Sequence, residues 1–347
     1  MFFRVASPRR PSRLLAAAVS LTTPLLPEDF VSLVDPLWST TALRGRVVEV
    51  RPETARATTL RIRPGRGWTG HRAGQYVRIG VDVNGVRHWR TYSLSSPESP
   101  ADGCLTVTVQ AQPDGVVSGH LAHSTPVGTI VQLEPADGDF VLPSAVSGPL
   151  LMITAGSGIT PVMAMLRTLA ALGPLPDLVL LHSAPTAAEV IFNDELRALA
   201  EQQHPSARLA LRHTTTEGRL DLAELDTLCP DWREREAFVC GPTGLLDAAA
   251  RHWASQPDRL HLERFTPPPR SAGGSGGVVS YGSADPVEVD GGTSLLEAGE
   301  AAGVLLPSGC RMGICFGCVL PLREGQVRDL RTGEVHGQDG QTIRTCI

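Results

Sequence analysis

The chain has 347 residues, which is enough for two or three domains that each bury a core of their own. It is 42% hydrophobic and 19% charged, with a formal net charge of −5, as expected for a folded protein in water. The mild acidity and the lack of a basic patch argue against nucleic acid as a partner.

Residues 1–42 begin with arginines and continue into an apolar run from Leu14 to Leu21. This run is too short to span a bilayer, so we predict a helical extension that packs on the next domain or rests on a membrane surface. A twin-arginine export signal is the alternative. Four of the seven cysteines cluster near the C-terminus, which favours a reducing compartment over a disulfide framework. We therefore expect a cytoplasmic protein, and consider peripheral attachment to the inner face of the membrane.

Residues 43–145 hold six short strand-like runs that are separated by Gly, Pro and Asp turn residues. This spacing predicts an antiparallel barrel of six strands, and Asn84-Gly85 between two runs is a hairpin signal. One run carries "RTYS", from Arg90 to Ser93. Further on, "GVVS" precedes a predicted helix start, where a hydroxyl and backbone amides can bind an anion.

In residues 146–266 four apolar runs alternate with helical segments, which predicts a parallel sheet covered on both faces. The first run ends in "GSGITP", from Gly156 to Pro161, and Pro161 is expected at the first position of the helix that follows. Glycines at such a turn let a dinucleotide phosphate approach the backbone, where the helix dipole favours its charge. A later run ends in "VCGP". Without further context, we interpret its Cys240 as a small buried apolar residue.

The charge pattern after the second apolar run bears on the choice of nucleotide. After Ser183 no acid follows until Glu189, and Arg212 and Arg219 follow the next strand. An enzyme that selects NADH usually offers a carboxylate to the adenosine ribose. The pattern therefore favours NADPH over NADH.

Residues 267–277 are rich in Pro, Gly and Ser and are predicted to form a flexible linker. The small module that follows, residues 278–347, carries cysteines in the spacing C-x4-C-x2-C with a fourth far behind. This is the spacing of a plant-type [2Fe–2S] cluster, and structural zinc or disulfides are the alternatives. The predicted metal ligands are Cys310, Cys315, Cys318 and Cys346.

The last module resembles the plant-type ferredoxin domain through "SLLEAGEAAGVLLPSGCRMGICFGC" and Thr345-Cys346. That family normally continues past the fourth cysteine into a closing strand, whereas only Ile347 follows here. We therefore expect either a truncated chain or a missing last strand, and a weakly held Cys346. The module has nine acidic residues and five arginines, and an acidic face around the cluster would steer it towards a basic partner. Alternatively, these acidic residues only keep the surface of the module soluble and bind no partner.

"RTYS", "GVVS", "GSGITP" and "VCGP" together resemble the motifs of the ferredoxin–NADP reductase superfamily. The resemblance implies that Arg90 binds the flavin pyrophosphate, Tyr92 packs on the flavin and Ser93 bonds near its N5. It implies that Cys240 lies beside the nicotinamide, which makes Ser93 and Cys240 the candidate catalytic residues. Phe265 is expected either against the flavin or as the last core aromatic. The candidate cofactor-binding residues are Arg90, Thr91, Tyr92, Ser93, Thr108, Gln110, Gly115, Val116, Val117, Ser118, Gly156, Ser157, Gly158, Ile159, Thr160, Pro161, Ser183, Arg212, Arg219, Cys240, Gly241, Pro242 and Phe265.

The order of the segments implies a multidomain oxidoreductase in which electrons pass from NADPH (or NADH) to FAD, which is favoured over FMN, and then to a [2Fe-2S] cluster. Flavins exchange electrons in pairs or singly, so the flavin belongs between the other two. The resemblance implies a monomer that serves an oxygen-activating partner. "DPLWSTTALRGRVVEV" and the cysteine run look most like reductases of membrane-bound stearoyl-CoA or fatty-acid desaturases. Alternatives are the reductase of a ring-hydroxylating, di-iron or P450 monooxygenase, an iron–sulfur redox sensor, or an electron-gating subunit.

Overall fold

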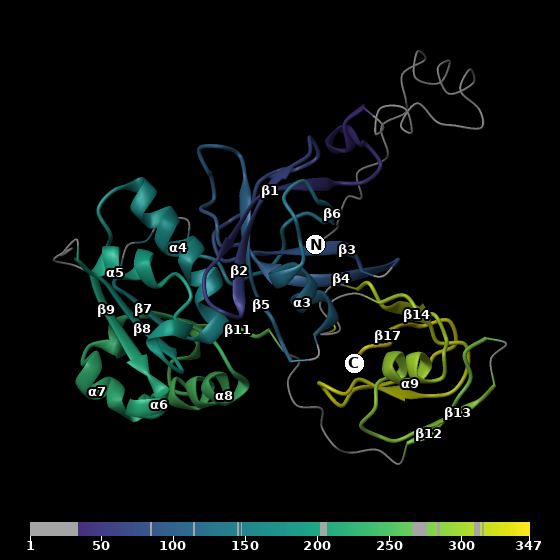
Figure 1. The fold of residues 1–347 in the computed structure, drawn as a ribbon. Coiled ribbons are helices and arrows are strands. Elements are labelled where there is room, and N and C mark those ends of the chain that lie inside the picture. The colour runs from purple at the N-terminus through teal and green to yellow at the C-terminus, as the bar shows by residue number, and fades with distance from the viewer. Residues whose placement is uncertain are drawn as a thin grey trace.

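The computed structural model describes residues 34–347, except 84, 114, 144–145, 147, 202–206, 266–275, 283–284, 309–312 and 314–315. Predictions about residues 1–33, about Asn84, about most of the linker and about Cys310 and Cys315 therefore fall outside the described residues. Three bodies follow one another along the chain (Figure 1). Among the described helices, none is both long and apolar enough to cross a membrane.

The first body is a six-stranded antiparallel sheet in the order β4-β3-β6-β1-β2-β5. A bridge between Leu94 and Val107 links the two outer strands and closes the barrel. Alternate residues of β3, among them Val77, Ile79 and Val81, enter the barrel core because side chains of a strand alternate between its faces. The predicted six-stranded barrel is confirmed. Its elements are η1 (Pro36–Trp38), β1 (Arg44–Pro52), β2 (Ala57–Pro64), β3 (Tyr76–Val83), β4 (Val86–Ser93), β5 (Leu105–Gln110), α3 (Val116–His123) and β6 (Ile130–Leu133).

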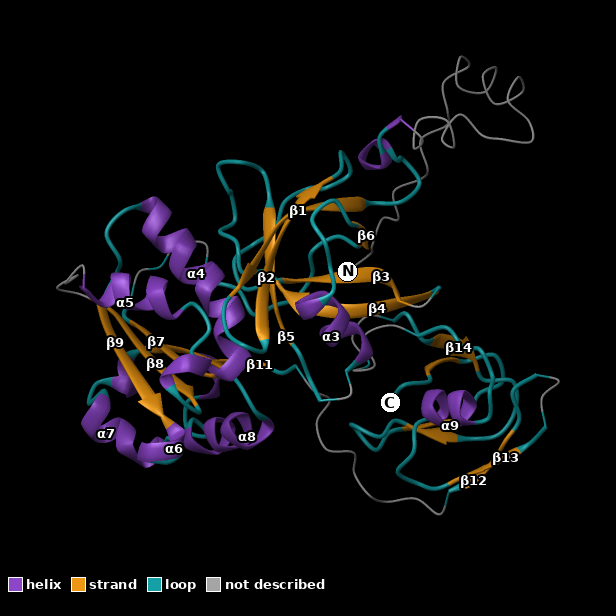
Figure 2. Ribbon diagram, viewed as in Figure 1, coloured by secondary structure: helices purple, strands orange, loops and turns teal. Residues whose placement is uncertain are grey.

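The second body is a five-stranded parallel sheet in the order β11-β10-β7-β8-β9, with helices on both faces (Figure 2). On β7, Leu150 and Met152 join one apolar cluster, while Leu151 and Ile153 join another, so both faces are buried, as predicted. The elements are β7 (Leu150–Ala155), η2 (Gly156–Gly158), α4 (Ile159–Leu172), β8 (Leu178–Ala184), η3 (Ala187–Glu189), α5 (Asn193–Glu201), β9 (Ala207–His213), α6 (Thr214–Glu217), η4 (Leu222–Glu224), α7 (Leu225–Leu228), η5 (Trp232–Glu234), β10 (Glu236–Cys240), α8 (Thr243–His252), η6 (Pro257–Arg259) and β11 (Leu260–Glu263).

One arginine ties the first two bodies together. Arg167 on α4 donates to the Ser95 carbonyl oxygen at 2.6 Å and pairs with Glu195 of α5. The Glu98 backbone amide also donates to the Thr168 hydroxyl at 3.1 Å. These contacts hold the barrel against the helix that begins at the predicted nucleotide turn.

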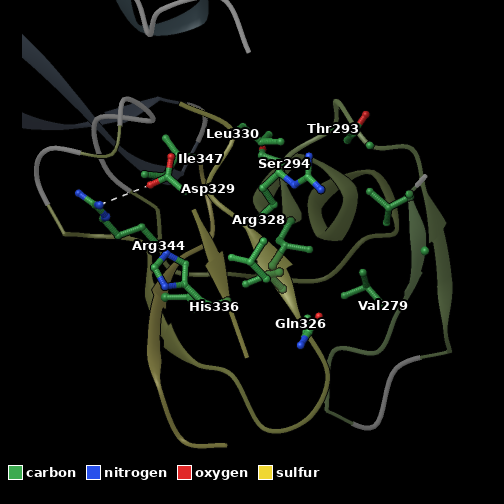
Figure 3. A pocket seen from close by; sticks show the side chains of 18 of the residues that line it. Val279, Thr293, Ser294, Gln326, Arg328, Asp329, Leu330, His336, Arg344 and Ile347 are labelled. Atoms are coloured by element: carbon green, nitrogen blue, oxygen red, sulfur yellow. Dashed lines mark ion pairs between the residues drawn. The ribbon is translucent and has the colours of Figure 1, made fainter. Parts of the chain in front are cut away.

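The described residues of the third body form three two-stranded antiparallel sheets and one helix. A capping box between Ser294 and Glu297 fixes the start of this helix. Its core is small and includes Leu296, Cys318 and Cys346. Residues of β12, β15, β16 and β17 line a cavity of about 600 Å³ inside this module (Figure 3). The elements are β12 (Gly277–Val279), β13 (Val287–Val289), α9 (Leu295–Ala301), β14 (Val319–Pro321), β15 (Val327–Arg328), β16 (Val335–His336) and β17 (Thr342–Arg344).

Candidate functional site

The "RTYS" segment forms the end of β4 on the barrel. Ser93 is buried and lies directly opposite Tyr76 of β3. Tyr92 packs against the barrel core, and burial raises the pKa of its hydroxyl well above the usual range, so it stays neutral. The hydroxyl of Thr91 is buried without a hydrogen-bond partner among the described residues. Side chains of successive strand residues face opposite sides of a sheet, so Thr91, which pairs with Arg78, lies on the face away from Arg90 and Tyr92. Binding of a flavin by Arg90, Tyr92 and Ser93 stays a prediction.

Two other predicted flavin contacts lie on β5. The hydroxyl of Thr108 takes part in a buried ladder, 2.8 Å from the Thr59 hydroxyl and 3.2 Å from that of Ser95. Gln110 ends the strand and pairs with Ala57 of β2. The ladder gives Thr108 a role in the barrel wall, and its contact with the cofactor stays a prediction.

The predicted second phosphate segment is the N-terminus of α3, with Gly115 as its N-cap. The Ser118 hydroxyl accepts from the Gln112 amide at 3.1 Å and donates to the Gly115 carbonyl at 3.2 Å. Val117 is buried, which fixes the helix on the barrel, and Val116 is exposed. The helix begins at Val116, inside the segment, two residues before the predicted start at Ser118. The first amides of a helix have no partner within it.

The dinucleotide turn and "VCGP" meet at the carboxyl edge of the parallel sheet. Gly156 has a φ of +55°, which favours glycine. A Cβ on Gly158 would lie 2.1 Å from the Cys240 carbonyl oxygen, and one on Gly241 would lie 3.2 Å from the Ala155 Cβ. β7 and β10 are neighbours whose connections leave in opposite directions, which is where open α/β sheets bind ligands. Sequence reasoning predicted both turns, and the structure brings them into contact.

The remaining residues of the turn shape the start of α4. The Thr160 hydroxyl donates to the Ser157 carbonyl at 2.9 Å, and Ile159, Thr160 and Pro161 are all buried. Pro161 was predicted at the first position of the helix. The helix starts at Ile159, so Pro161 is its third residue. It still lies in the first turn, where the missing amide costs no hydrogen bond.

Cys240 lies fully buried at the end of β10, directly opposite Glu263 of β11. Burial, and then the charge of Glu263, raise the pKa of the Cys240 thiol, which therefore stays protonated. Burial, and then the charge of Asp139, raise the pKa of Glu263 to about 7. The sequence analysis did not single out Glu263. An acidic residue at the end of a strand, close to a predicted site, could have indicated it.

The raised pKa of Glu263 predicts a pH-dependent stability. Between its unfolded value of about 4.3 and about 7, the folded chain binds more protons than the unfolded one, so stability falls as pH rises through this window. We expect the free energy of unfolding to fall by about 2 kcal/mol less over this pH window in Glu263→Gln than in wild type. Denaturant titrations at pH 5 and pH 8, followed by the fluorescence of buried Trp253, measure it. Glu234→Gln, at an exposed position of the same body, is the control, and equal pH slopes in wild type and Glu263→Gln would refute the prediction.

The predicted ribose-phosphate residues lie at neighbouring strand ends. Ser183 is the second-to-last residue of β8 and lies opposite Arg212 of β9. The Arg212 guanidinium forms a two-pronged ion pair with Glu224 and also donates to the Arg219 carbonyl at 3.2 Å. The side chain of Arg219 is exposed. The sequence analysis did not predict the ion pair with Glu224, because the sequence does not indicate which acidic residue lies next to Arg212.

Phe265 packs half-buried against the core cluster of the parallel sheet. This contact agrees with the interpretation of Phe265 as the last core aromatic of the body. Its contact with a flavin stays a prediction.

Two of the four predicted cluster ligands are described, and both lie in the core of the third body. Cys318 and Cys346 are almost fully buried. Thr345 ties the two segments, since its amide and its hydroxyl both donate to the Cys318 carbonyl, at 3.1 and 2.9 Å. Cys346 is therefore held more firmly than we expected from its position in the sequence, because the residue before it anchors it.

The loop between the first three cysteines is braced by charged residues. The Arg344 side chain donates to the Gly313 carbonyl and stacks over the Phe316 ring at 5.2 Å. Arg344 lies 3.6 Å from the buried carboxylate of Asp329 (Figure 3). Arg331 lies at the same distance of 3.6 Å from it. The acidic face expected around the cluster is not found here, since the described side chains next to this loop are mainly basic.

A cleft of about 650 Å³ joins all three bodies. Its walls include Tyr76, the neighbour of Ser93, and Glu263, the neighbour of Cys240. Gly313 and Phe316 of the cysteine loop line it from the third body. The strand neighbours of Ser93 and Cys240 and the described part of the cysteine loop thus border one space.

These features define an oxidoreductase with a flavin-type barrel, a nucleotide-binding sheet and an iron–sulfur module. Family models agree: an oxidoreductase FAD-binding domain matches residues 52–142, an oxidoreductase NAD-binding domain 152–251, and a 2Fe-2S iron-sulfur cluster binding domain 280–347. The chain belongs to the ferredoxin–NADP reductase superfamily, with a C-terminal 2Fe-2S domain, and is an NAD(P)H oxidoreductase of this type.

Three relatives illustrate the family. An NADPH oxidoreductase of Mycobacterium tuberculosis is 50% identical, over 95% of this chain and 88% of the relative. The ferredoxin reductase component of 3-ketosteroid-9-alpha-monooxygenase from the same species is 33% identical, over 69% of this chain and 70% of the relative. The crystal structure of phthalate dioxygenase reductase has the same fold, with a TM-score of 0.62 and 21% identity over 88% of this chain and 94% of that chain.

Proposed function

We propose that the protein passes electrons from NADPH through FAD to a [2Fe-2S] cluster and on to an oxygen-activating partner. The observation that carries the proposal is the single cleft bordered by the neighbours of Ser93 and Cys240 and by the cysteine loop. A bound flavin supplies the exchange between two-electron and one-electron transfer. The relative that serves a monooxygenase supports an oxygenase as the partner.

In this proposal the chain's own residues bind and orient the cofactors. Arg90 and the start of α3 hold the flavin phosphates, and Thr91 belongs to the same flavin-binding segment. Ser93 bonds at the flavin N5, and the neutral Cys240 thiol packs on the nicotinamide without adding charge. Cys310, Cys315, Cys318 and Cys346 bind the cluster. The bodies correspond to residues 43–145, 146–266 and 278–347, with a linker at 267–277.

NADPH is the proposed donor because Arg212 and Arg219 flank the strand ends where its 2′-phosphate would lie. We expect Arg212→Ala to raise the KM for NADPH about tenfold, since it removes a charge-assisted contact and leaves Glu224 without its cation. The KM for NADH should change less than twofold. Steady-state ferricyanide reduction measures both, and Arg251→Ala, at an exposed position on α8, is the control. Equal increases for the two nucleotides would contradict a phosphate-binding role.

As partner we propose a membrane-bound fatty-acyl desaturase, with the protein as a cytoplasmic monomer that approaches the membrane through its N-terminal extension. The likeness of "DPLWSTTALRGRVVEV" and of the cysteine run to desaturase reductases supports this choice. The test is reconstitution of the holoprotein with purified desaturases and monooxygenases in lipid vesicles, with NADPH and NADH compared in each. Desaturated product is the expected result. Turnover with a hydroxylase alone would refute the desaturase and retain the oxygenase class.

A further inference from the structure

The cleft of about 650 Å³ has walls of opposite charge. The barrel contributes Asp137 and Asp139, both exposed, and β11 contributes Glu263. Arg264 also lines this wall, but its guanidinium lies 2.8 Å from Asp247, which balances its charge. The wall formed by the first two bodies is therefore acidic.

The opposite wall comes from the iron–sulfur module and is basic. Its charged residues are Arg331 and Arg344, which share the single carboxylate of Asp329. Two guanidinium groups around one carboxylate leave a net positive charge. The described residues of the module that line the cleft include no acid, although the module as a whole has more acids than arginines.

The tip of the cysteine loop lies in the same cleft. Phe316 is 66% exposed and has a φ of +54°, which is unusual for a residue with a large side chain. Arg344 stacks on its ring at 5.2 Å and also binds the Gly313 carbonyl, so the guanidinium is coupled to the loop. The basic wall therefore holds the loop with its aromatic tip towards the first two bodies.

From these contacts we infer that the iron–sulfur module docks on the acidic rim of its own chain through Arg331 and Arg344, with Asp137 and Asp139 as the complementary surface. Charges of opposite sign attract over a Debye length of about 8 Å at physiological salt, and salt screens them. Docking is therefore reversible and depends on ionic strength. The inference rests on the proposed function, since docking places the cluster beside the flavin site.

Docking of the module also limits access of an external partner to the cysteine loop. Gly313 and Phe316 face the cleft, so another protein cannot approach this side of the loop while the module is docked. The same contact that speeds electron entry thus blocks exit on this face, so an acceptor that uses this face receives electrons only after the module undocks. Turnover with an external protein acceptor should therefore pass through a maximum as salt concentration rises.

The test reverses the charge on the acidic rim of the holoprotein. Asp139→Arg is suitable because Asp139 is exposed, and Arg331→Asp in the same chain restores the charge complementarity. Asp258→Arg, at an exposed position outside the cleft, changes the net charge equally and is the control. Stopped-flow absorbance separates flavin reduction by NADPH from the later reduction of the cluster, and small-angle X-ray scattering measures the radius of gyration.

We expect Asp139→Arg to slow cluster reduction about tenfold at low salt and to increase the radius of gyration. The double variant should recover both quantities, and Asp258→Arg should change neither by more than twofold. Wild-type cluster reduction and radius of gyration without any salt dependence, or an Asp139→Arg variant equal to wild type, would overturn the inference. If NADPH does not reduce the wild-type cluster at all, the proposed function fails, and scattering alone decides whether the module docks.

Discussion

Replacing Gly158 with alanine is expected to lower kcat/KM for NADPH about a hundredfold. The new Cβ would lie 2.1 Å from the Cys240 carbonyl oxygen and 2.5 Å from its carbonyl carbon. Both are backbone atoms of a paired strand, so they cannot move aside as a flexible side chain does. The dinucleotide turn and the Cys240 turn must then separate, which misplaces the nicotinamide. Ferricyanide reduction with NADPH measures the loss.

The control for this prediction is Gly244→Ala on α8, where a Cβ would meet nothing within 4 Å. The conformation of Gly158 is also ordinary, with a φ of −61°, so its variant tests crowding without backbone strain. Flavin content and circular dichroism should match wild type in both variants. A Gly158→Ala protein that oxidises NADPH at the wild-type rate would show that the two turns need not touch.

Replacing Cys318 with serine is expected to remove the cluster and to lower cytochrome c reduction about a hundredfold, while ferricyanide reduction by the flavin continues. Cys318 is almost fully buried in the small core of the third body, next to the segment that carries Cys346. A module of about 70 residues has little core beyond its metal site, so we expect it to unfold in this variant. The barrel and the parallel sheet have separate cores and should be unaffected.

Visible absorbance and electron paramagnetic resonance of the reduced protein report the cluster directly. Cys104→Ser is the matched control, because Cys104 is also buried but lies in the barrel at the start of β5. Cytochrome c reduction that persists in the Cys318→Ser protein would show that electrons leave from the flavin, and would remove the cluster from the route.

Local patterns carried most of the fold prediction. Strand alternation on β3 and strong turn signals depend on neighbours in sequence, so the six barrel strands and the parallel sheet could be predicted. The turn at Gly156 and Gly158 was also visible, because glycine at a strand-to-helix turn has a local physical reason. The same approach placed the start of α4 at Pro161, two residues after its actual start at Ile159, and errors of this size are typical of helix boundaries.

Contacts between distant segments could not be predicted. The pairing of Arg212 with Glu224 and the position of Glu263 opposite Cys240 depend on which strands and helices become neighbours. The same is true of the basic wall around the cysteine loop. Composition made the third module acidic overall, whereas the folded loop brings Arg331 and Arg344 together at the cleft. Net charge does not reveal where charges gather.

The central claim is the order of electron transfer, and anaerobic stopped-flow absorbance of the holoprotein mixed with NADPH tests it most directly. The flavin and cluster bands are followed separately, in wild type and in Cys318→Ser. We expect that the flavin is reduced first, that the cluster follows in wild type, and that flavin reduction alone remains at an unchanged rate in the variant. A cluster that stays oxidised beside a fully reduced flavin, or one that is reduced before it, would refute this order of transfer.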